Sequence, residues 1–118
     1  MTRSFATKGF SDEQKSIYDV VLNAQVKSIE GIKPGMSCKS IDSIARDHIE
    51  KAGYSKFFDH GLGHSLGLEI HDDPRFSKVS DDFLEENYVM TVEPGIYVPD
   101  IGGVRIEDDI IVTKNGAE

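Results

Sequence analysis

The sequence is poor in cysteine, in positive charge and in long apolar runs. Its single cysteine, Cys38, excludes an internal disulfide and a structural zinc site built from several thiolates. Acidic residues outnumber basic ones by 21 to 13, so the formal charge of -8 disfavours binding to nucleic acid and anionic lipid. No apolar run is long enough to cross a bilayer, and the first residues form no apolar signal core. We therefore expect a soluble, cytoplasmic protein with no nucleic-acid or membrane partner.

The chain has 118 residues, of which 38% are hydrophobic, enough for one domain with a single core. Ser11 stands three residues before Gln14, a spacing typical of a capping box. A helical stripe follows, made of Ile17, Tyr18, Val21, Leu22 and Ile29. The pattern predicts a helix over 11–32, which ends because Pro34 and Gly35 favour a turn.

A second helix is predicted over residues 40–54. Its apolar stripe consists of Ile41, Ile44, Ala45, His48, Ile49 and Ala52, and Gly53 is a natural residue for the helix end. We interpret His48 as a packed side chain rather than a ligand, because no partner stands at helical spacing from it. The short connection predicts that the two helices form an antiparallel pair.

Beyond Phe57 the apolar period shifts toward two, which indicates β structure. The predicted strands are residues 3–7, 63–71, 88–94 and 103–113, with a loop over 72–87. Helices followed by antiparallel strands place the chain in the α+β class.

Three of the four histidines, His60, His64 and His71, fall in the stretch HGLGHSLGLEIHDDP at residues 60–74. The spacing of His60 and His64 matches one face of a helix, but the surrounding glycines disfavour a helix and no glutamate follows either histidine. As a strand, the stretch places His64 and His71 on opposite faces unless a bulge intervenes.

Two later segments supply carboxylates. Glu93 follows an apolar strand and precedes Pro94, so a turn can project it into a cleft, although an exposed turn glutamate is the alternative. In the last strand, alternation places Val104, Ile106, Asp108 and Ile110 on one face and Arg105, Glu107 and Asp109 on the other. A plain ion pair between Arg105 and Glu107 is the alternative to a functional role.

Taken together, one imidazole and two carboxylates suit a divalent ion such as Mn, Co or Zn. The single cysteine excludes a thiolate-rich structural zinc site, so these residues favour a catalytic ion over a structural one. Such an ion would lower the pKa of a bound water and polarise a carbonyl group.

Three motifs in order carry a resemblance: HGLGHSLGLEIHDDP, TVEPGIYVP and GGVRIEDDIIVT. They resemble the second half of the M24 metallopeptidases, and most of all the Xaa-Pro group of prolidase and aminopeptidase P. The resemblance implies a pita-bread fold, in which a curved antiparallel sheet is covered by helix pairs and holds two metal ions. It also implies hydrolysis of the peptide bond preceding proline, with a proline-containing peptide as substrate.

The resemblance assigns roles to six residues. His64 and Glu93 resemble metal ligands, Glu93 also handling protons, and Glu107 resembles the glutamate that bridges both metals. His71 resembles the histidine that binds the substrate and the tetrahedral intermediate, while His60 and Arg105 resemble residues of the substrate pocket.

The family also uses two aspartate ligands that no motif of this chain matches. We therefore expect residues 1–118 to be the C-terminal half of a catalytic domain, with three of the five family ligands and at most one ion. We expect little peptidase activity from the chain alone. Half a curved sheet leaves an open edge and apolar surface, which favours a homodimer or association with the missing half-domain.

Two other interpretations stay open from the sequence. The first is a non-catalytic interaction module, as in the peptidase-like domains of the FACT histone chaperone. The second is a hydrolase of the methionine aminopeptidase type.

Overall fold

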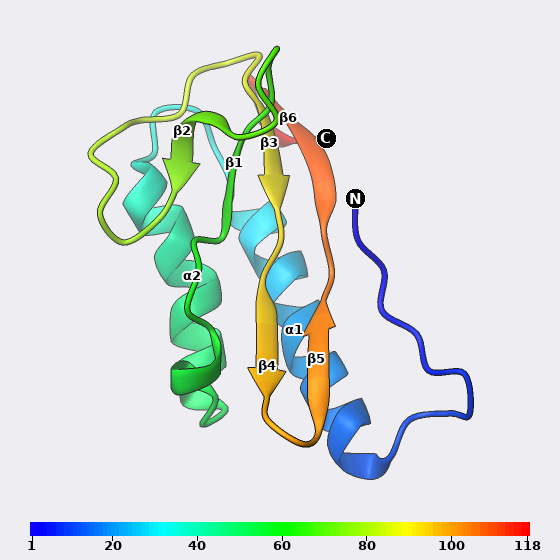
Figure 1. The fold of residues 1–118 in the computed structure, drawn as a ribbon. Helices are drawn as coiled ribbons and strands as arrows, with labels where there is room; N and C mark the ends of the chain where they lie inside the picture. The colour runs from blue at the N-terminus through cyan, green and yellow to red at the C-terminus, as the bar shows by residue number, and fades with distance from the viewer.

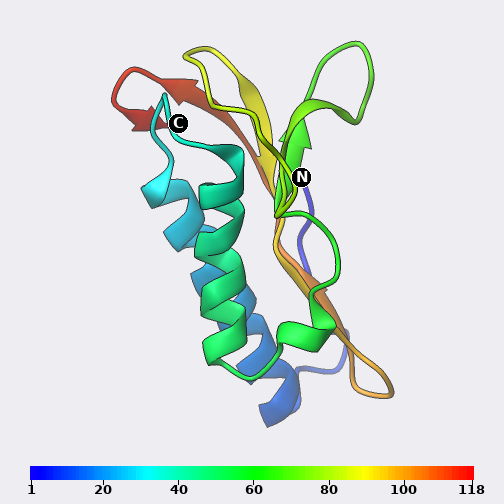
Figure 2. The ribbon, with the colours of Figure 1, turned by 90° about the vertical axis from the view of Figure 1, so that its left-hand side faces the viewer.

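A computed structural model describes residues 1–118. Two helices, α1 (Asp12–Gly31) and α2 (Cys38–Lys51), come first and pack against each other, and the strands follow. Figures 1 and 2 show both helices lying against the same face of a curved antiparallel sheet. No helix combines the length and the apolar character that a bilayer crossing requires.

Helix α1 begins as its sequence predicts. The Gln14 amide donates to Ser11 Oγ at 3.2 Å, and the Ser11 amide donates to the Gln14 side-chain oxygen at 3.0 Å, so the capping box is confirmed. The helix ends at Gly31, one residue before the predicted limit. The helix start was predictable because its two capping groups lie three residues apart.

The buried face of α1 differs in part from the predicted stripe. Ile17 and Val21 are buried, as expected, but Leu22 is 37% exposed. The polar Gln25 is buried instead, because its amide donates to Asp108 Oδ2 on the sheet at 2.6 Å. A hydrogen-bonding partner from a distant strand thus changes which side chain the core accepts.

Helix α2 begins at Cys38, two residues before the predicted start, and its last residue is Lys51. Ser37 caps it by accepting the Ser40 amide at 3.1 Å. Gly53 adopts the left-handed conformation, with φ of +87°, so the predicted helix end is confirmed. Ala52, which the stripe included, is exposed.

The strands form one larger sheet and one ribbon, both antiparallel. The sheet has the order β2 (Asp72–Phe76), β1 (Gly63–Ser65), β3 (Val89–Val92), β6 (Asp108–Thr113) and β7 (Gly116–Ala117). The ribbon pairs β4 (Gly95–Val98) with β5 (Gly102–Arg105), and a short 3-10 helix, η1 (Ser55–Phe57), lies between α2 and β1.

The ribbon prolongs the sheet through two adjacent breaks. Figure 1 shows β4 continuing the line of β3, and β5 leading into β6. Glu93 and Pro94 interrupt the first line, while Ile106 and Glu107 interrupt the second. The Ile106 amide donates to the Pro94 carbonyl oxygen at 3.4 Å, so the two breaks lie side by side. Both predicted glutamate ligands therefore stand where the sheet bends.

Three strand predictions need correction. Residues 63–71 do not form one strand: β1 stops at Ser65, its register with β2 shifts between His64 and Ser65, and a turn leads to β2. The predicted loop over 72–87 consequently contains β2. The run 103–113 is divided between β5 and β6, and residues 3–7 form no strand. These differences arise from bulges and bends, which an alternating pattern does not encode.

The N-terminal segment makes a single bridge to the sheet, at Thr2 opposite Glu107. Ser4 adds to this contact by donating its hydroxyl to the Arg105 carbonyl oxygen at 3.0 Å. The segment therefore runs beside the bend between β5 and β6 without forming an extended ladder.

The core lies between the helix pair and the sheet. Its buried apolar side chains form one cluster, and Val104, Ile106 and Ile110 belong to it, which confirms the predicted alternation in the last strands. The opposite face of those strands carries Arg105 and Glu107. The buried face thus anchors the strands, and the other face is free for polar side chains.

Candidate metal centre

The predicted site residues gather around two adjoining hollows on the sheet face opposite the helices. One hollow, of about 560 Å³, is lined by His60, His64, His71, Glu93 and Arg105 among others. The second, of about 310 Å³, shares four of these residues and adds Glu107. All six residues assigned from the sequence therefore line one hollow or the other. His64 lies in β1, and the other five residues lie before β1, directly before β2, in the break between β3 and β4, and at the break between β5 and β6.

His64 and Glu93 form the closest pair in this cluster. Nε2 of His64 lies 3.2 Å from Oε1 of Glu93, and both side chains are largely buried, with 13% and 17% exposed. Nδ1 of His64 lies 3.0 Å from the carbonyl oxygen of Ser65, which can only accept a hydrogen bond. The proton of a neutral His64 therefore belongs on Nδ1, and the lone pair of Nε2 is directed toward the carboxylate.

The contact between Nε2 of His64 and Oε1 of Glu93 is suited to a bound cation. A lone pair that faces a carboxylate oxygen is repulsive unless a cation or a proton lies between them. A histidine whose other nitrogen donates to a backbone carbonyl is also the usual arrangement of a metal ligand. The donor chemistry of His64 and Glu93 therefore fits a divalent cation.

The third predicted ligand is engaged elsewhere. The Thr2 hydroxyl donates to the carboxylate of Glu107, and the amino group of Met1 lies 3.5 Å from its other oxygen. Burial raises the pKa of Glu107, but the hydrogen bond from Thr2 and the nearby positive charges outweigh burial and leave that pKa below its ordinary value. Glu107 is therefore an anionic donor at neutral pH.

The candidate ligands do not form a complete coordination group. No three His, Cys, Asp or Glu side chains lie close enough together to hold an ion. His64 and Glu93 are in contact, whereas Glu107 lines the second hollow and accepts a hydrogen bond from Thr2. The expected set of three ligands is thus brought to one region, with two members in contact.

His71 lies beside His64, contrary to the prediction that the two occupy opposite faces. Their ring centroids are 4.6 Å apart and the rings meet edge to face. The register shift after His64 and the turn that follows reverse the chain and return His71 to the same side. A bulge, which the sequence left open as a possibility, decides this point.

Tyr97, which is not among the site residues predicted from the sequence, connects His60 and Arg105. The Tyr97 hydroxyl lies 2.9 Å from Nε2 of His60. Its hydrogen bond with Arg105 is the main reason why the pKa of that guanidinium is raised, with Glu93 and Glu107 adding to the effect. Arg105 is therefore held as a cation at the rim of both hollows.

Two glycines explain how Tyr97 reaches this position. A Cβ atom on Gly95 would lie 2.4 Å from the Tyr97 hydroxyl oxygen, and one on Gly103 would lie 2.7 Å from the edge of its ring. The ring therefore lies across the ribbon over two residues that have no side chain. The motif GIYV with a glycine pair following it was the available signal.

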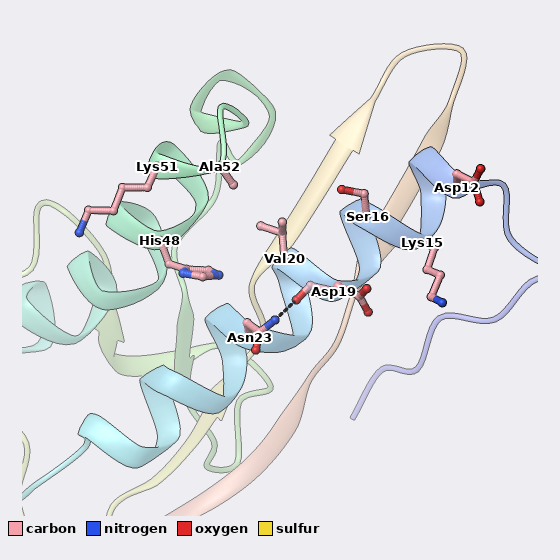
Figure 3. A pocket seen from close by; sticks show the side chains of 9 residues that line it. All are labelled: Asp12, Lys15, Ser16, Asp19, Val20, Asn23, His48, Lys51 and Ala52. Atoms are coloured by element: carbon pink, nitrogen blue, oxygen red, sulfur yellow. Dashed lines mark hydrogen bonds between the residues drawn. The ribbon is translucent and has the colours of Figure 1, made fainter.

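His48 belongs to a different region. Figure 3 shows it on α2 beside α1, in an open groove of about 550 Å³ that contains none of the predicted site residues. Its Nδ1 lies 3.0 Å from the Lys27 amino group, and burial together with Lys27 and Lys51 lowers its pKa. His48 is thus partly packed and paired with a lysine, and it takes no part in the histidine cluster.

Comparisons with known proteins agree with this geometry. The model of metallopeptidase family M24 matches residues 1–114. An Xaa-Pro dipeptidase of Pyrococcus horikoshii is 50% identical over the whole chain, which covers 34% of that relative. The solved prolidase of Pyrococcus furiosus has a TM-score of 0.96 at 48% identity, covering 98% of this chain and 34% of that one. An X-Pro aminopeptidase of Thermotoga maritima has a TM-score of 0.88 at 45% identity, over 92% of this chain and 31% of that one.

These similarities confirm the predicted class, two antiparallel helices followed by a curved antiparallel sheet that forms part of a pita-bread fold. The chain spans about a third of the length of the relatives that it matches.

Proposed function

Because the chain belongs to metallopeptidase family M24, we propose that it carries one side of a metal-dependent site that hydrolyses the peptide bond preceding proline. The observation that carries the proposal is the contact between His64 and Glu93, in which a backbone carbonyl sets the histidine proton on the far nitrogen. The names of the relatives, an Xaa-Pro dipeptidase, a prolidase and an X-Pro aminopeptidase, support the substrate class. They also favour this interpretation over an interaction module and over a methionine aminopeptidase.

In this proposal His64, Glu93 and Glu107 hold the ion, which is Mn or Co, with Zn as a further possibility. When bound, such an ion supplies Lewis acidity and lowers the pKa of a water molecule. Three donors from this chain suit one ion, so a second ion needs carboxylates from elsewhere.

The other residues of the cluster bind and orient the substrate. His71 stands at the mouth of the hollows next to His64, where its ring can donate a hydrogen bond to the carbonyl oxygen of the scissile bond. Arg105 stays cationic and stabilises negative charge that develops there. His60 acts through Tyr97, which it holds in place against Arg105. In the proposed reaction Glu93 accepts a proton from the attacking water and returns it to the leaving nitrogen.

Proline shapes the recognition problem. The nitrogen of the scissile bond has no hydrogen when proline follows it, so a site for this bond cannot rely on that donor. The hollow beside Arg105 is also lined by Val79, whose exposed side chain offers apolar surface to a pyrrolidine ring.

The proposed metal site predicts how single substitutions of its ligands affect the binding of Mn²⁺. Calorimetric titration of Mn²⁺ into the metal-free chain should give roughly one weakly bound ion per chain, because three donors are present. His64→Ala and Glu93→Ala should abolish binding. His48→Ala is the matched control, since it removes a partly buried histidine outside the cluster, and it should bind as the unmodified chain does. Undiminished binding by His64→Ala would refute the site.

We also propose that the chain works in an assembly, either as a homodimer or with a chain that supplies the remaining part of the peptidase domain. Leu68 and Ile70 support this, because they are 108% and 71% exposed in the turn that leads to His71. Light scattering on the purified chain should accordingly give a molar mass above that of one chain. A strictly monomeric, well-folded species would contradict the homodimer and leave the second chain as the remaining form of the proposal.

A further inference from the structure

The ladder between β1 and β3 is interrupted beside His64. On one side of the interruption, the Leu66 amide donates to the Val89 carbonyl oxygen at 3.0 Å. On the other side, the Glu93 amide donates to the Leu62 carbonyl oxygen at 2.7 Å. Between these bonds the His64 amide donates to a side chain instead, the hydroxyl of Thr91, at 3.0 Å. A threonine hydroxyl therefore replaces a backbone carbonyl at the candidate ligand itself.

Gly63 permits the hydrogen bond from the His64 amide to the Thr91 hydroxyl, because a residue without a side chain lets β1 and β3 approach closely. A Cβ atom at Gly63 would lie 1.9 Å from the Thr91 carbonyl oxygen and 2.9 Å from its hydroxyl oxygen. Thr91 is 1% exposed, so no water competes for its hydroxyl. The close approach and the burial together fix where that hydroxyl lies.

The hydroxyl hydrogen of Thr91 is donated to the carboxylate of Glu93. Because Oγ1 of Thr91 already accepts the His64 amide, its own hydrogen is free to donate, and Oε1 of Glu93 lies 3.0 Å away. The same Oε1 lies 3.2 Å from Nε2 of His64. Thr91 thus connects the backbone of one candidate ligand to the carboxylate of the other.

We propose that Thr91 is a positioning residue that sets the separation and orientation of His64 and Glu93 for a divalent cation. The inference deepens the proposed function and rests on it. Thr91 suits this role because a β-branched side chain has a restricted χ1 angle, so a hydroxyl bonded at both ends has little freedom to move. The Thr91 hydroxyl holds the carboxylate of Glu93 in place before an ion binds, which reduces the conformational entropy that is lost on binding.

Two substitutions separate the hydroxyl from the shape of the side chain. Thr91→Val keeps the branched shape and removes both hydrogen bonds, while Thr91→Ser keeps the hydroxyl. Thr113→Val is the control, because Thr113 also donates one hydrogen bond and accepts another on a strand but lies outside both hollows. If Thr91→Val fails to fold, Thr91→Ala provides the same loss of the hydroxyl with a smaller side chain.

The measurement is paramagnetic broadening of amide resonances by Mn²⁺, which detects weak binding and locates it. We expect Thr91→Val to need roughly 10-fold more Mn²⁺ for the same broadening, the low end of the effect of a residue that orients a ligand. Thr91→Ser and Thr113→Val should stay close to the unmodified chain. In the metal-free protein, hydrogen exchange at the His64 amide should speed up in Thr91→Val and not in Thr91→Ser.

The outcomes distinguish the two proposals. Equal Mn²⁺ affinity in Thr91→Val and the unmodified chain would overturn the role of Thr91 while leaving the metal site intact. Absence of Mn²⁺ binding in the unmodified chain would overturn the metal site, and with it any role of Thr91 toward an ion. Weakened binding in Thr91→Val, restored in Thr91→Ser, supports both.

Discussion

Gly63→Ala should destabilise the protein by about 3 kcal/mol or more, at the upper end of the cost of overpacking. The added methyl would lie 1.9 Å from the carbonyl oxygen of Thr91 and 2.7 Å from its carbonyl carbon. Both atoms belong to the backbone of β3, which pairs with β6 on its other side and cannot move away cheaply. Because Gly63 directly precedes His64, any shift of β1 also displaces the candidate ligand. Urea unfolding followed by circular dichroism measures the loss.

Gly31→Ala is the control for this substitution. Its added methyl would also meet another atom too closely, the end of the Ile44 side chain at 2.6 Å. That atom is the tip of a flexible side chain, and Gly31 is a helix residue, where alanine is favoured over glycine. We expect a change within about 1 kcal/mol of zero. Equal losses in both variants would show that the close approach of β1 to β3 is not the cause.

Asp42→Ala should destabilise the protein by about 3–5 kcal/mol, the usual cost of removing one partner of a buried ion pair. Asp42 is 1% exposed and accepts hydrogen bonds from Arg46 at 2.7 and 2.9 Å. It also accepts the Leu62 amide at 3.1 Å, and Leu62 in turn accepts the Glu93 amide. Removing the carboxylate therefore leaves a buried guanidinium without a counter-charge and releases the segment that leads into β1.

Arg46 extends the effect toward the histidine cluster. Its guanidinium donates to the carbonyl oxygens of Phe58 at 3.1 Å and His60 at 2.9 Å, and it stacks over the Phe58 ring at 4.4 Å. Without its counter-charge, the Arg46 guanidinium is more stable in solvent. Its movement toward solvent would break its hydrogen bond to the His60 carbonyl oxygen. Asp47→Ala, an exposed aspartate on the same helix, is the control and should change stability by less than about 1 kcal/mol. A loss of that small size for Asp42→Ala, measured by urea unfolding, would contradict the structural role assigned to the pair.

The local features of the fold were predictable from the sequence because their causes are local. The capping box joins Ser11 to Gln14, and the left-handed Gly53 ends a helix of regular period. The alternation of Val104, Ile106 and Ile110 follows from the geometry of a strand. Each of these patterns involves residues a few positions apart. Their physical basis is the repeat of a helix or a strand, which the sequence displays directly.

The candidate site was predictable only in its members. The motifs named His64, Glu93, Glu107, His71, His60 and Arg105, and the structure brings all six to two adjoining hollows. Their roles stay a prediction that the proposed titrations test. Tyr97 and Thr91 were missed, because each acts through hydrogen bonds to residues of other strands or loops rather than through a recognisable motif of its own.

The sequence by itself determined the helices, the buried face of the last strands, and which side chains are the candidate metal ligands. Only the tertiary structure decided that β1 ends at Ser65, that His71 turns back onto His64, and that both glutamates stand at bends in the sheet. It also decided that Asp42 and Thr91 are buried hydrogen-bonding partners. The physical reason is distance along the chain: these arrangements depend on strand pairing and bulges that join residues far apart, and no local periodicity records them.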